Sequence, residues 1–439
     1  MTDGSPIRLM IRFSLPLLLI NVLQLVFVVV DSAILGRLLG VNAFASVGVT
    51  GSIHWMGLSS IFGIVHGFSV QFAQRFGAKD EEGLRKSFAT GLILALLLSA
   101  VIIITGVFGA RPVLRLLDTP RNLIDGAAVY LIVFFAGAPV VFAYNILGGM
   151  LRSLGDSRTP LNAMILATVL NIGFDFALVV PFGIAGVSAA TILAQGTASV
   201  YCFIVLKKTG YLRGDGFRWD GGAAAGLLKL GLPLAIRNAV IEIGGFVVQR
   251  HTNTYGEEFI AGIAAAKRMY SLLLVAGGAV EAAVATFVAQ NFGAGLKERV
   301  RRGVYDGLKM MLVSTAAIMA ISLPFGRQIL ALLVEGDPVQ IALVLDAGVQ
   351  QLTVYSIGLP LLCLLFLYRS ALQGIGNTFI PMLSGIFEFL LRIVTVVTLT
   401  PIWDKWGVYL SDAFGWVAAT SLLVISYYIV FKRLYAQSP

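Results

Sequence analysis

The sequence is poor in charge for its length. Only 13% of its 439 residues are charged and 58% are hydrophobic, whereas about a quarter of a soluble domain is charged. Apolar runs longer than about 18 residues recur along the whole chain, which is typical of membrane-spanning helices. The composition therefore excludes a water-soluble protein and predicts an all-α membrane protein.

Cysteine and catalytic motifs are scarce as well. Cys202 and Cys363 lie in apolar runs of different halves, so they predict neither a disulfide framework nor a metal site. No Walker A, GxSxG or HExxH motif occurs. His54, His66 and His251 are not at metal-ligand spacing, and we interpret His54 and His66 as packing or hydrogen-bonding residues. We expect no enzyme activity, no cofactor and no metal.

The net charge of +9 comes from the loops rather than from one basic face. Basic residues precede the first apolar run and follow every second run, as at Arg8, Arg75 and Lys432, whereas segments 181–186 and 403–407 carry few. Arg111, Arg115 and Arg121 are exceptions. This positive-inside asymmetry predicts cytoplasmic termini and an even number of spans in an inner membrane. We expect no nucleic-acid partner.

Glycine, proline and charge clusters divide the apolar runs into about 12 spans. The expected spans are 9–39, 44–73, 88–109, 124–150, 159–181, 184–206, 230–253, 259–289, 304–325, 341–372, 378–401 and 413–433. A polar, glycine-rich stretch at 207–226 predicts a cytoplasmic linker between an N-terminal lobe (1–206) and a C-terminal lobe (227–439).

The two halves repeat each other. AQRFGAKDEEGLRKSFATGL at 73–92 aligns without gaps on AQNFGAGLKERVRRGVYDGL at 289–308, and GDSRTP at 155–160 on GNTFIP at 376–381. Both copies of the first motif follow an even-numbered span, so the repeat is parallel. Such repeats are typical of transporters with a site near the membrane midplane, although duplication without a mechanism remains the alternative.

Two carboxylates, Asp31 and Asp175, lie deep in apolar runs of the N-terminal half, where ionisable groups are expensive and usually functional. Three polar stripes at helical spacing surround them. The stripes are Asn21, Gln24 and Asp31; Thr168, Asn171 and Asp175; and Ser188, Thr191 and Gln195. Tyr144 and Asn145 add polar groups from the fourth span. No basic residue lies as deep in this half, so the pattern predicts a hydrated cavity for a cation or proton.

Burial disfavours the charged form of a carboxylate, and a second carboxylate nearby disfavours it further. One member of such a pair can therefore take up a proton on one side of a membrane and release it on the other. The structural alternative is that Asp31 caps broken helix backbone or packs through hydrogen bonds. We favour proton binding.

Deep charges of the C-terminal half come with both signs. They are Arg237, Glu242, Lys267, Arg268, Glu281, Glu388 and Arg392. Paired charges brace a helix bundle more often than they move ions, and Glu388 and Arg392 are spaced i, i+4. We interpret this set as structural. Glu242 is kept as a candidate site residue because Asn238, Glu242 and Gln249 form one stripe.

Several motifs resemble the multidrug and toxic compound extrusion (MATE) transporters. They are VDSAILGRLLG at 30–40, LRSLGDSRTPL at 151–161, NIGFDFALVVPFGIAGVSAA at 171–190, ATFVAQNFGA at 285–294 and LQGIGNTFIP at 372–381. With Asp31 in the first span, the chain is most similar to the prokaryotic DinF-like branch. The resemblance implies a V-shaped antiporter of two six-helix lobes related by pseudo-twofold symmetry. Such a protein exports amphipathic, often cationic drugs or toxins by alternating access against inward H+ or Na+.

The resemblance also implies roles for individual residues. Similar proteins bind the cation with an Asp of the first span and with an Asp and an Asn of the fifth, which correspond to Asp31, Asp175 and Asn171. Gln24, Asn145 and Thr191 correspond to the polar lining of the cavity, and Pro16 to a proline near which the first helix is proposed to bend. The stripes add Tyr144 and Gln195 to the lining.

The sequence departs from the family pattern in two places. A second branch of the family has acids in the seventh and tenth spans; here Glu242 lies near the first position, but Gln350, Gln351 and Tyr355 supply no acid in the tenth span. The segment 174–176 reads FDF instead of Asp-Pro, which predicts a weaker kink in the fifth span.

Two alternatives stay open. A lipid-linked oligosaccharide flippase of the same superfamily would share the architecture but needs arginines around its cavity, and the N-terminal half has few at depth. A membrane-embedded enzyme or receptor would need a catalytic cluster or a large extramembrane domain. The favoured antiporter, with H+ preferred to Na+ as coupling ion, is expected to be a monomer with an amphipathic small-molecule substrate and membrane lipid as its partners.

Overall fold

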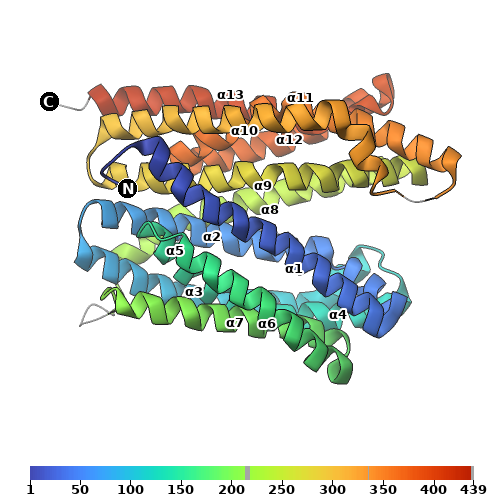
Figure 1. Ribbon diagram of the computed structural model, residues 1–439, viewed down its shortest axis with the longest axis horizontal. Helices are drawn as coiled ribbons and strands as arrows, with labels where there is room; N and C mark the ends of the chain where they lie inside the picture. The colour runs from blue at the N-terminus through green and yellow to red at the C-terminus, as the bar shows by residue number, and fades with distance from the viewer. Residues whose placement is uncertain (213–217, 335, 437–439) are drawn as a thin grey trace. The chain divides into compact units, whose positions relative to one another are not determined.

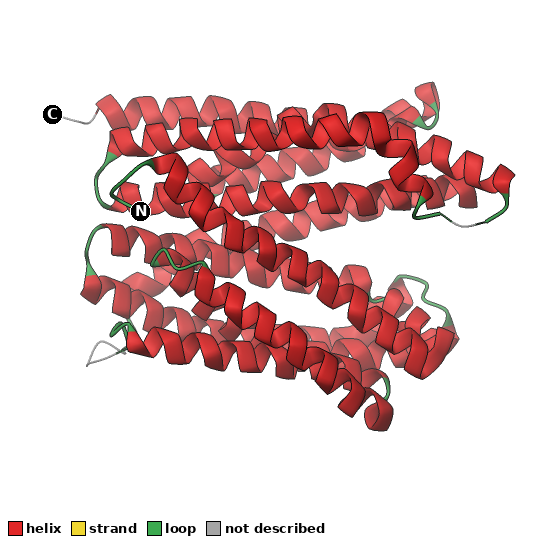
Figure 2. Ribbon diagram, viewed as in Figure 1, coloured by secondary structure: helices red, strands yellow, loops and turns green. Residues whose placement is uncertain are grey.

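A computed structural model describes residues 1–212, 218–334 and 336–436, and this part of the chain contains helices and no strand (Figures 1 and 2). The α-helices of the first half are α1 Pro6–Gly48, α2 Gly51–Gly77, α3 Glu81–Leu116, α4 Arg121–Ala136, α5 Ala138–Ser153, α6 Arg158–Phe182 and α7 Ile184–Lys208. Those of the second half are α8 Gly221–Thr252, α9 Glu257–Gly293, α10 Lys297–Ala331, α11 Pro338–Gly374, α12 Phe379–Trp403 and α13 Trp406–Ala436. A short 3-10 helix, Asn253–Tyr255, extends α8.

The helices have the length and composition of membrane spans. Among the described residues, eleven helices are long and apolar enough to cross a membrane, and the bent pair α4 and α5 makes up to 12 if it forms one span. Large apolar side chains such as Val29 on α1 and Phe108 on α3 are exposed to the surroundings, as expected of a surface that faces lipid. The prediction of an all-α, multi-span membrane protein is confirmed.

The span predicted at 124–150 is not one straight helix. It is broken at Gly137, where α4 and α5 meet at 48°. Pro139 follows two residues later and has no N–H to donate, so one bond of the helical hydrogen-bond ladder is missing beside this break. The predicted end of the first span at residue 39 agrees with a break in α1, and the helical segment after this break continues to Gly48. The non-helical residue at the break is Gly40, at φ 80°. The start of the second span, predicted at residue 44, needs correction, because α2 begins at Gly51.

The chain divides into two compact units. One comprises residues 12–235 and the other residues 1–11 with 236–439. In the first unit, α2 packs against α3 and α5, and α6 packs against α7; in the second, α9 packs against α11 and α12 against α13. The predicted linker at 207–226 lies partly outside the described residues, and the lobe boundaries drawn from it stay a prediction.

The sequence repeat corresponds to repeated local structure. Helices α2 and α9 end with the same three backbone hydrogen bonds, donated by Ala78 to Gln74, Lys79 to Phe76 and Asp80 to Arg75, and by Ala294 to Gln290, Gly295 to Phe292 and Leu296 to Asn291. The residue in the left-handed region is Lys79 at φ 57° in one copy and Gly295 at φ 73° in the other. The turns after α5 and α11 agree in the same way, at Gly155 and Gly376.

Helices α1, α4, α6 and α7 share an apolar cluster within unit 12–235. Leu35 and Ala43 of α1 pack with Val179 of α6 and Val187 of α7, and Tyr130 of α4 borders them. Asp31, Asp175 and Thr191 each lie one helical turn from a member of this cluster, on the same helix faces. The cluster therefore fixes the three helices that carry the candidate site.

Candidate functional site: two carboxylates on α1 and α6

The site is centred on Asp31, which is half-buried on α1. Thr191 of α7 places its Oγ1 atom 3.2 Å from Asp31 Oδ2. The same Oγ1 atom lies 3.1 Å from the backbone carbonyl of Val187. A threonine hydroxyl has only one hydrogen, so full occupation of both contacts requires a second proton, which a protonated Asp31 would supply.

Asp175 and Asn171 complete the site from α6. Their side chains are one turn apart and are 0% and 1% exposed. Both lie close enough to the Asp31 carboxylate to interact with it electrostatically. The structure thus brings together Asp31, Asn171, Asp175 and Thr191, residues far apart in the sequence and carried by three helices.

Several polar atoms of this site have no hydrogen-bond partner in the described part of the chain. Asp31 Oδ1, both Asp175 carboxylate oxygens and both polar atoms of the Asn171 side chain are buried without a hydrogen bond. Buried polar groups are hydrogen-bonded in the large majority of cases, so several orphans together need an explanation. Neither carboxylate pairs with a basic residue among the described side chains. Oxygen atoms in this arrangement fit a proton or a hard cation.

The other predicted lining residues lie farther from this centre. Gln195 is one turn beyond Thr191 on α7, and its Oε1 atom is another buried oxygen without a partner among described residues. Gln24 lies two turns before Asp31 on the same face of α1. Asn145 donates to the Val141 carbonyl of its own helix at 2.8 Å, and the Tyr144 hydroxyl contacts Met164 Sδ at 3.8 Å. These contacts do not bring Tyr144 or Asn145 to Asp31.

Pro16 is buried within α1, which remains helical on both sides of it. Helix α6 is likewise continuous through Asp175. The interruption in α1 is at Gly40 instead, where the absence of a side chain makes a positive φ inexpensive. A role of Pro16 in bending therefore stays a prediction.

His54 of α2 adds a polar contact beside the site. Its Nδ1 atom lies 3.1 Å from the Tyr130 hydroxyl of α4, and its ring stacks on Phe134 at 3.9 Å. The interpretation of His54 as a packing and hydrogen-bonding residue is confirmed.

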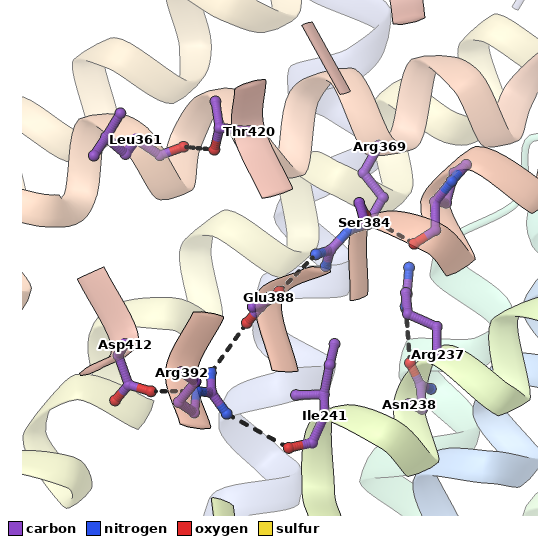
Figure 3. A network of polar contacts seen from close by, with 11 residues as sticks. Arg237, Asn238, Ile241, Leu361, Arg369, Ser384, Glu388, Arg392, Asp412 and Thr420 are labelled. Atoms are coloured by element: carbon purple, nitrogen blue, oxygen red, sulfur yellow. Dashed lines mark hydrogen bonds and ion pairs between the residues drawn. The ribbon is translucent and has the colours of Figure 1, made fainter. Parts of the chain in front are cut away.

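Four charged residues of the C-terminal half form a buried network within unit 1–11 and 236–439 (Figure 3). Glu388 of α12 bridges Arg369 of α11 at 3.5 Å and Arg392 of α12 at 3.0 Å. Arg392 Nε reaches Asp412 of α13 at 2.8 Å, and the Tyr355 hydroxyl donates to the same carboxylate. The predicted structural role of the Glu388–Arg392 pair agrees with this bracing of three helices. Sequence reasoning missed Arg369 and Asp412.

The sequence does contain a signal for Arg369, because it is the single arginine of the largely apolar segment LLFLYRSALQG. Glu242 is half-buried on α8, and its role as a C-terminal site residue stays a prediction.

The MatE family model matches residues 16–177 and 233–398. The chain belongs to the MATE family. It is 34% identical over 304 residues to the probable multidrug resistance protein YpnP of Bacillus subtilis, with 68% of each chain covered. It is 26% identical over 347 residues to an FAD transporter of Shewanella oneidensis, covering 76% of each chain.

A solved structure has the same fold. A crystal structure of MATE in complex with MaL6 matches 99% of this chain and 98% of its own with a TM-score of 0.90, at 23% identity. The resemblance to MATE transporters found in the sequence is confirmed, and the chain is a multi-pass membrane protein of a transporter family.

Proposed function

We propose that this MATE protein exports amphipathic, often cationic small molecules in exchange for inward-moving protons. The observation that carries the proposal is the pair Asp31 and Asp175. Asp31 Oδ1 and both Asp175 oxygens are buried without a hydrogen bond among the described residues, and Thr191 Oγ1 lies 3.2 Å from Asp31 Oδ2. Multidrug resistance proteins among the relatives support the substrate class. The MatE match favours export over lipid-linked oligosaccharide flipping.

The proposed cycle loads protons onto Asp31 and Asp175 from outside, with Asn171 and Thr191 holding the carboxylates in place. Neutralising two charges removes the attraction for a cationic substrate, which then leaves. Alternating access carries the protons inward, where they are released and a new substrate binds beside Gln24, Asn145, Tyr144 and Gln195. The proposal includes cytoplasmic termini, a monomer in the inner membrane and a bend of α1 near Pro16.

Sodium is the second candidate coupling ion, because the chemistry of the unpartnered atoms in the site also suits a metal cation. The unpartnered atoms around Asp31 are mostly oxygens, namely those of Asp31, Asp175, Asn171 and Gln195. Such oxygens can ligate a hard cation without any protonation. Glu242 is the corresponding candidate in the C-terminal half.

Ethidium uptake into inside-out vesicles tests the proposal. A pH gradient, acid inside, and a Na+ gradient are imposed in separate experiments on wild type, on Asp31→Asn and on the control Asp125→Asn. Asp125 is exposed and pairs with Arg111 away from the site. We expect uptake driven by the pH gradient in wild type and control and its loss in Asp31→Asn. If only the Na+ gradient drives uptake, the coupling ion is Na+ rather than the proton. Full activity of Asp31→Asn would contradict the proposed role of Asp31 in coupling.

A further inference from the structure

The two halves differ in the kind of buried polar atom that has no hydrogen-bond partner among the described residues. Around Asp31 the unpartnered atoms are mainly oxygen acceptors, whereas in the second half they include guanidinium donors of Arg237 and Arg369. A buried donor without an acceptor is as expensive as a buried acceptor without a donor. The second half therefore carries a different recognition chemistry from the first.

Arg237 of α8 is the clearest case. Its Nε and Nη2 atoms donate to the amide oxygen of the adjacent Asn238, at 3.1 and 2.8 Å, and Nη1 is buried without an acceptor among the described residues. No described carboxylate lies within ion-pair distance of it. A buried guanidinium N–H group that has no acceptor is unfavourable. Figure 3 shows its guanidinium directed toward the helix segment that carries Ser384.

Two of the three nearby carboxylates are already engaged in ion pairs. Glu388 uses one oxygen for Arg369 and the other for Arg392, and Asp412 accepts from Arg392 and Tyr355. Glu281 of α9 lies within electrostatic range of Arg237 and Arg369 but forms no ion pair with a described residue. Arg369 also keeps its Nε atom buried without an acceptor. Two neighbouring guanidinium groups thus retain free donors.

Glycine makes room for these arginines between the helices. A Cβ atom on Gly385 of α12 would lie 2.5 Å from Arg237 Cγ, and one on Gly244 of α8 would lie 3.7 Å from Arg392 Nη1. The Arg237 stem therefore lies directly against α12. Arg392 and Arg237 are near the middle of α12 Phe379–Trp403 and of α8 Gly221–Thr252. Substrate sites of transporters built from repeats lie near that depth.

We propose that Arg237, together with the Nε group of Arg369, binds a phosphate or carboxylate group of an amphipathic substrate in the second half of the protein. Guanidinium groups recognise these oxyanions through paired N–H donors. The inference rests on the proposed export function and extends its substrate class from cations to molecules that carry an anionic group. The acceptor-rich site at Asp31 and the donor-rich site at Arg237 would then serve different chemical groups.

Equilibrium binding of two flavins tests the inference. Riboflavin and FMN share one fluorescent ring system, but only FMN carries a phosphate. Both are titrated, by fluorescence anisotropy and without any ion gradient, against the full chain in phosphatidylcholine nanodiscs. The variants are Arg237→Gln, Arg237→Lys and the control Arg250→Gln, which removes an exposed arginine of the same helix.

We expect FMN to bind wild type about tenfold or more tightly than riboflavin, as one charge-assisted contact implies. Arg237→Gln should remove this preference, Arg237→Lys should keep part of it, and Arg250→Gln should keep all of it. Equal affinity of wild type for the two flavins, or a preference unchanged in Arg237→Gln, overturns the inference. If Arg237→Gln does not fold, the wild-type ratio and Arg237→Lys still decide the question.

A lipid headgroup is the other source of such an anion. If phosphatidylglycerol in the nanodiscs lowers FMN affinity in wild type but not in Arg237→Gln, the site binds lipid and the substrate assignment is overturned. Failure of the export function is detected separately, because ethidium uptake depends on Asp31 and the flavin titration uses no gradient. If wild type shows gradient-driven ethidium uptake but binds the two flavins equally, the anion site is refuted and the export function is not.

Discussion

Thr191 Oγ1 lies 3.2 Å from Asp31 Oδ2 and 3.1 Å from the carbonyl of Val187, one turn earlier on its own helix. Its single hydrogen can serve the ionised carboxylate or the carbonyl. When Asp31 is protonated, the carboxyl can donate to Thr191 while Thr191 donates to Val187. The hydrogen bond between Thr191 and Asp31 can therefore be kept in both protonation states, which suits a group that repeatedly binds and releases a proton.

Thr191→Val removes the hydroxyl and keeps the side-chain shape. We expect initial rates of pH-driven ethidium uptake to fall about fivefold, because one hydrogen bond contributes about 1 kcal/mol. Thr191→Ser keeps the hydroxyl and should stay close to wild type. The measurement is a rate at matched protein amount in inside-out vesicles, and equal rates for the Val and Ser variants would show that the contact has no role in transport.

Asp175→Asn should separate function from stability. The side chain is 0% exposed and its oxygens have no partner among described residues, so the amide removes a buried charge that nothing compensates. We expect loss of gradient-driven uptake with thermal stability unchanged or raised, by about 1–3 kcal/mol.

The matched control is Asp306→Asn on α10, a buried aspartate that lies 3.8 Å from Lys309. This variant should lose stability while keeping transport. Thermal unfolding in detergent reports both variants, and a marked loss of stability in Asp175→Asn would mean that Asp175 braces the fold.

Glu388→Gln should destabilise the second half strongly. It leaves Arg369 and Arg392 buried, at 7% and 10% side-chain exposure, with one anion fewer. Removing one partner of a buried pair costs about 3–5 kcal/mol. The control Asp346→Asn breaks an exposed pair with Arg327 in the same unit and should change the unfolding free energy by less than about 1 kcal/mol. Similar unfolding temperatures for the two variants would contradict the bracing role of Glu388.

Asp80 is the N-cap residue of α3, and its contribution to the stability of the folded state should depend on pH. Its Oδ1 atom accepts a hydrogen bond from the Gly83 N–H at 2.9 Å, and Arg75 forms an ion pair with the same carboxylate. The pKa of this carboxyl is therefore lowered below its ordinary value, chiefly by the Gly83 N–H and also by Arg75. The folded state therefore gains stability above the unfolded pKa of about 4, which is lost as the pH falls through the folded value.

Asp80→Ala should lower stability by about 1 kcal/mol at neutral pH, as expected for an N-cap. The difference from wild type should shrink in acid. Asp80→Asn keeps the cap and should remove most of the pH dependence. Unfolding temperatures measured across the acidic range check the sign, and a difference that grows in acid would contradict it.

The acidic site could be predicted because Asp31 and Asp175 are isolated carboxylates in apolar runs, where composition alone marks them as exceptional. Their partners Asn171 and Thr191 followed from helical spacing and from the family resemblance. The contact between Thr191 and Asp31 could not be derived, because it depends on how α1 and α7 pack, and spacing within one helix carries no information about its neighbour.

The C-terminal network was predicted only in part. Glu388 and Arg392 are four residues apart on one helix, so their pairing is local. Arg369 and Asp412 join them from two other helices, and Asp412 lies next to a span end, where a charge needs no explanation. The break at Gly137 was missed because the run around it is apolar throughout; only Pro139 indicates that the backbone ladder is interrupted there.

Proton movement driven by a substrate gradient tests most directly whether Asp31 and Asp175 couple proton uptake to export. Proteoliposomes containing a trapped pH-sensitive dye are given an ethidium gradient with equal pH on both sides. Wild type should move protons opposite to ethidium, and Asp31→Asn should move none. Proton counter-movement of normal size in Asp31→Asn would show that the carboxylate pair of α1 and α6 is not the coupling site.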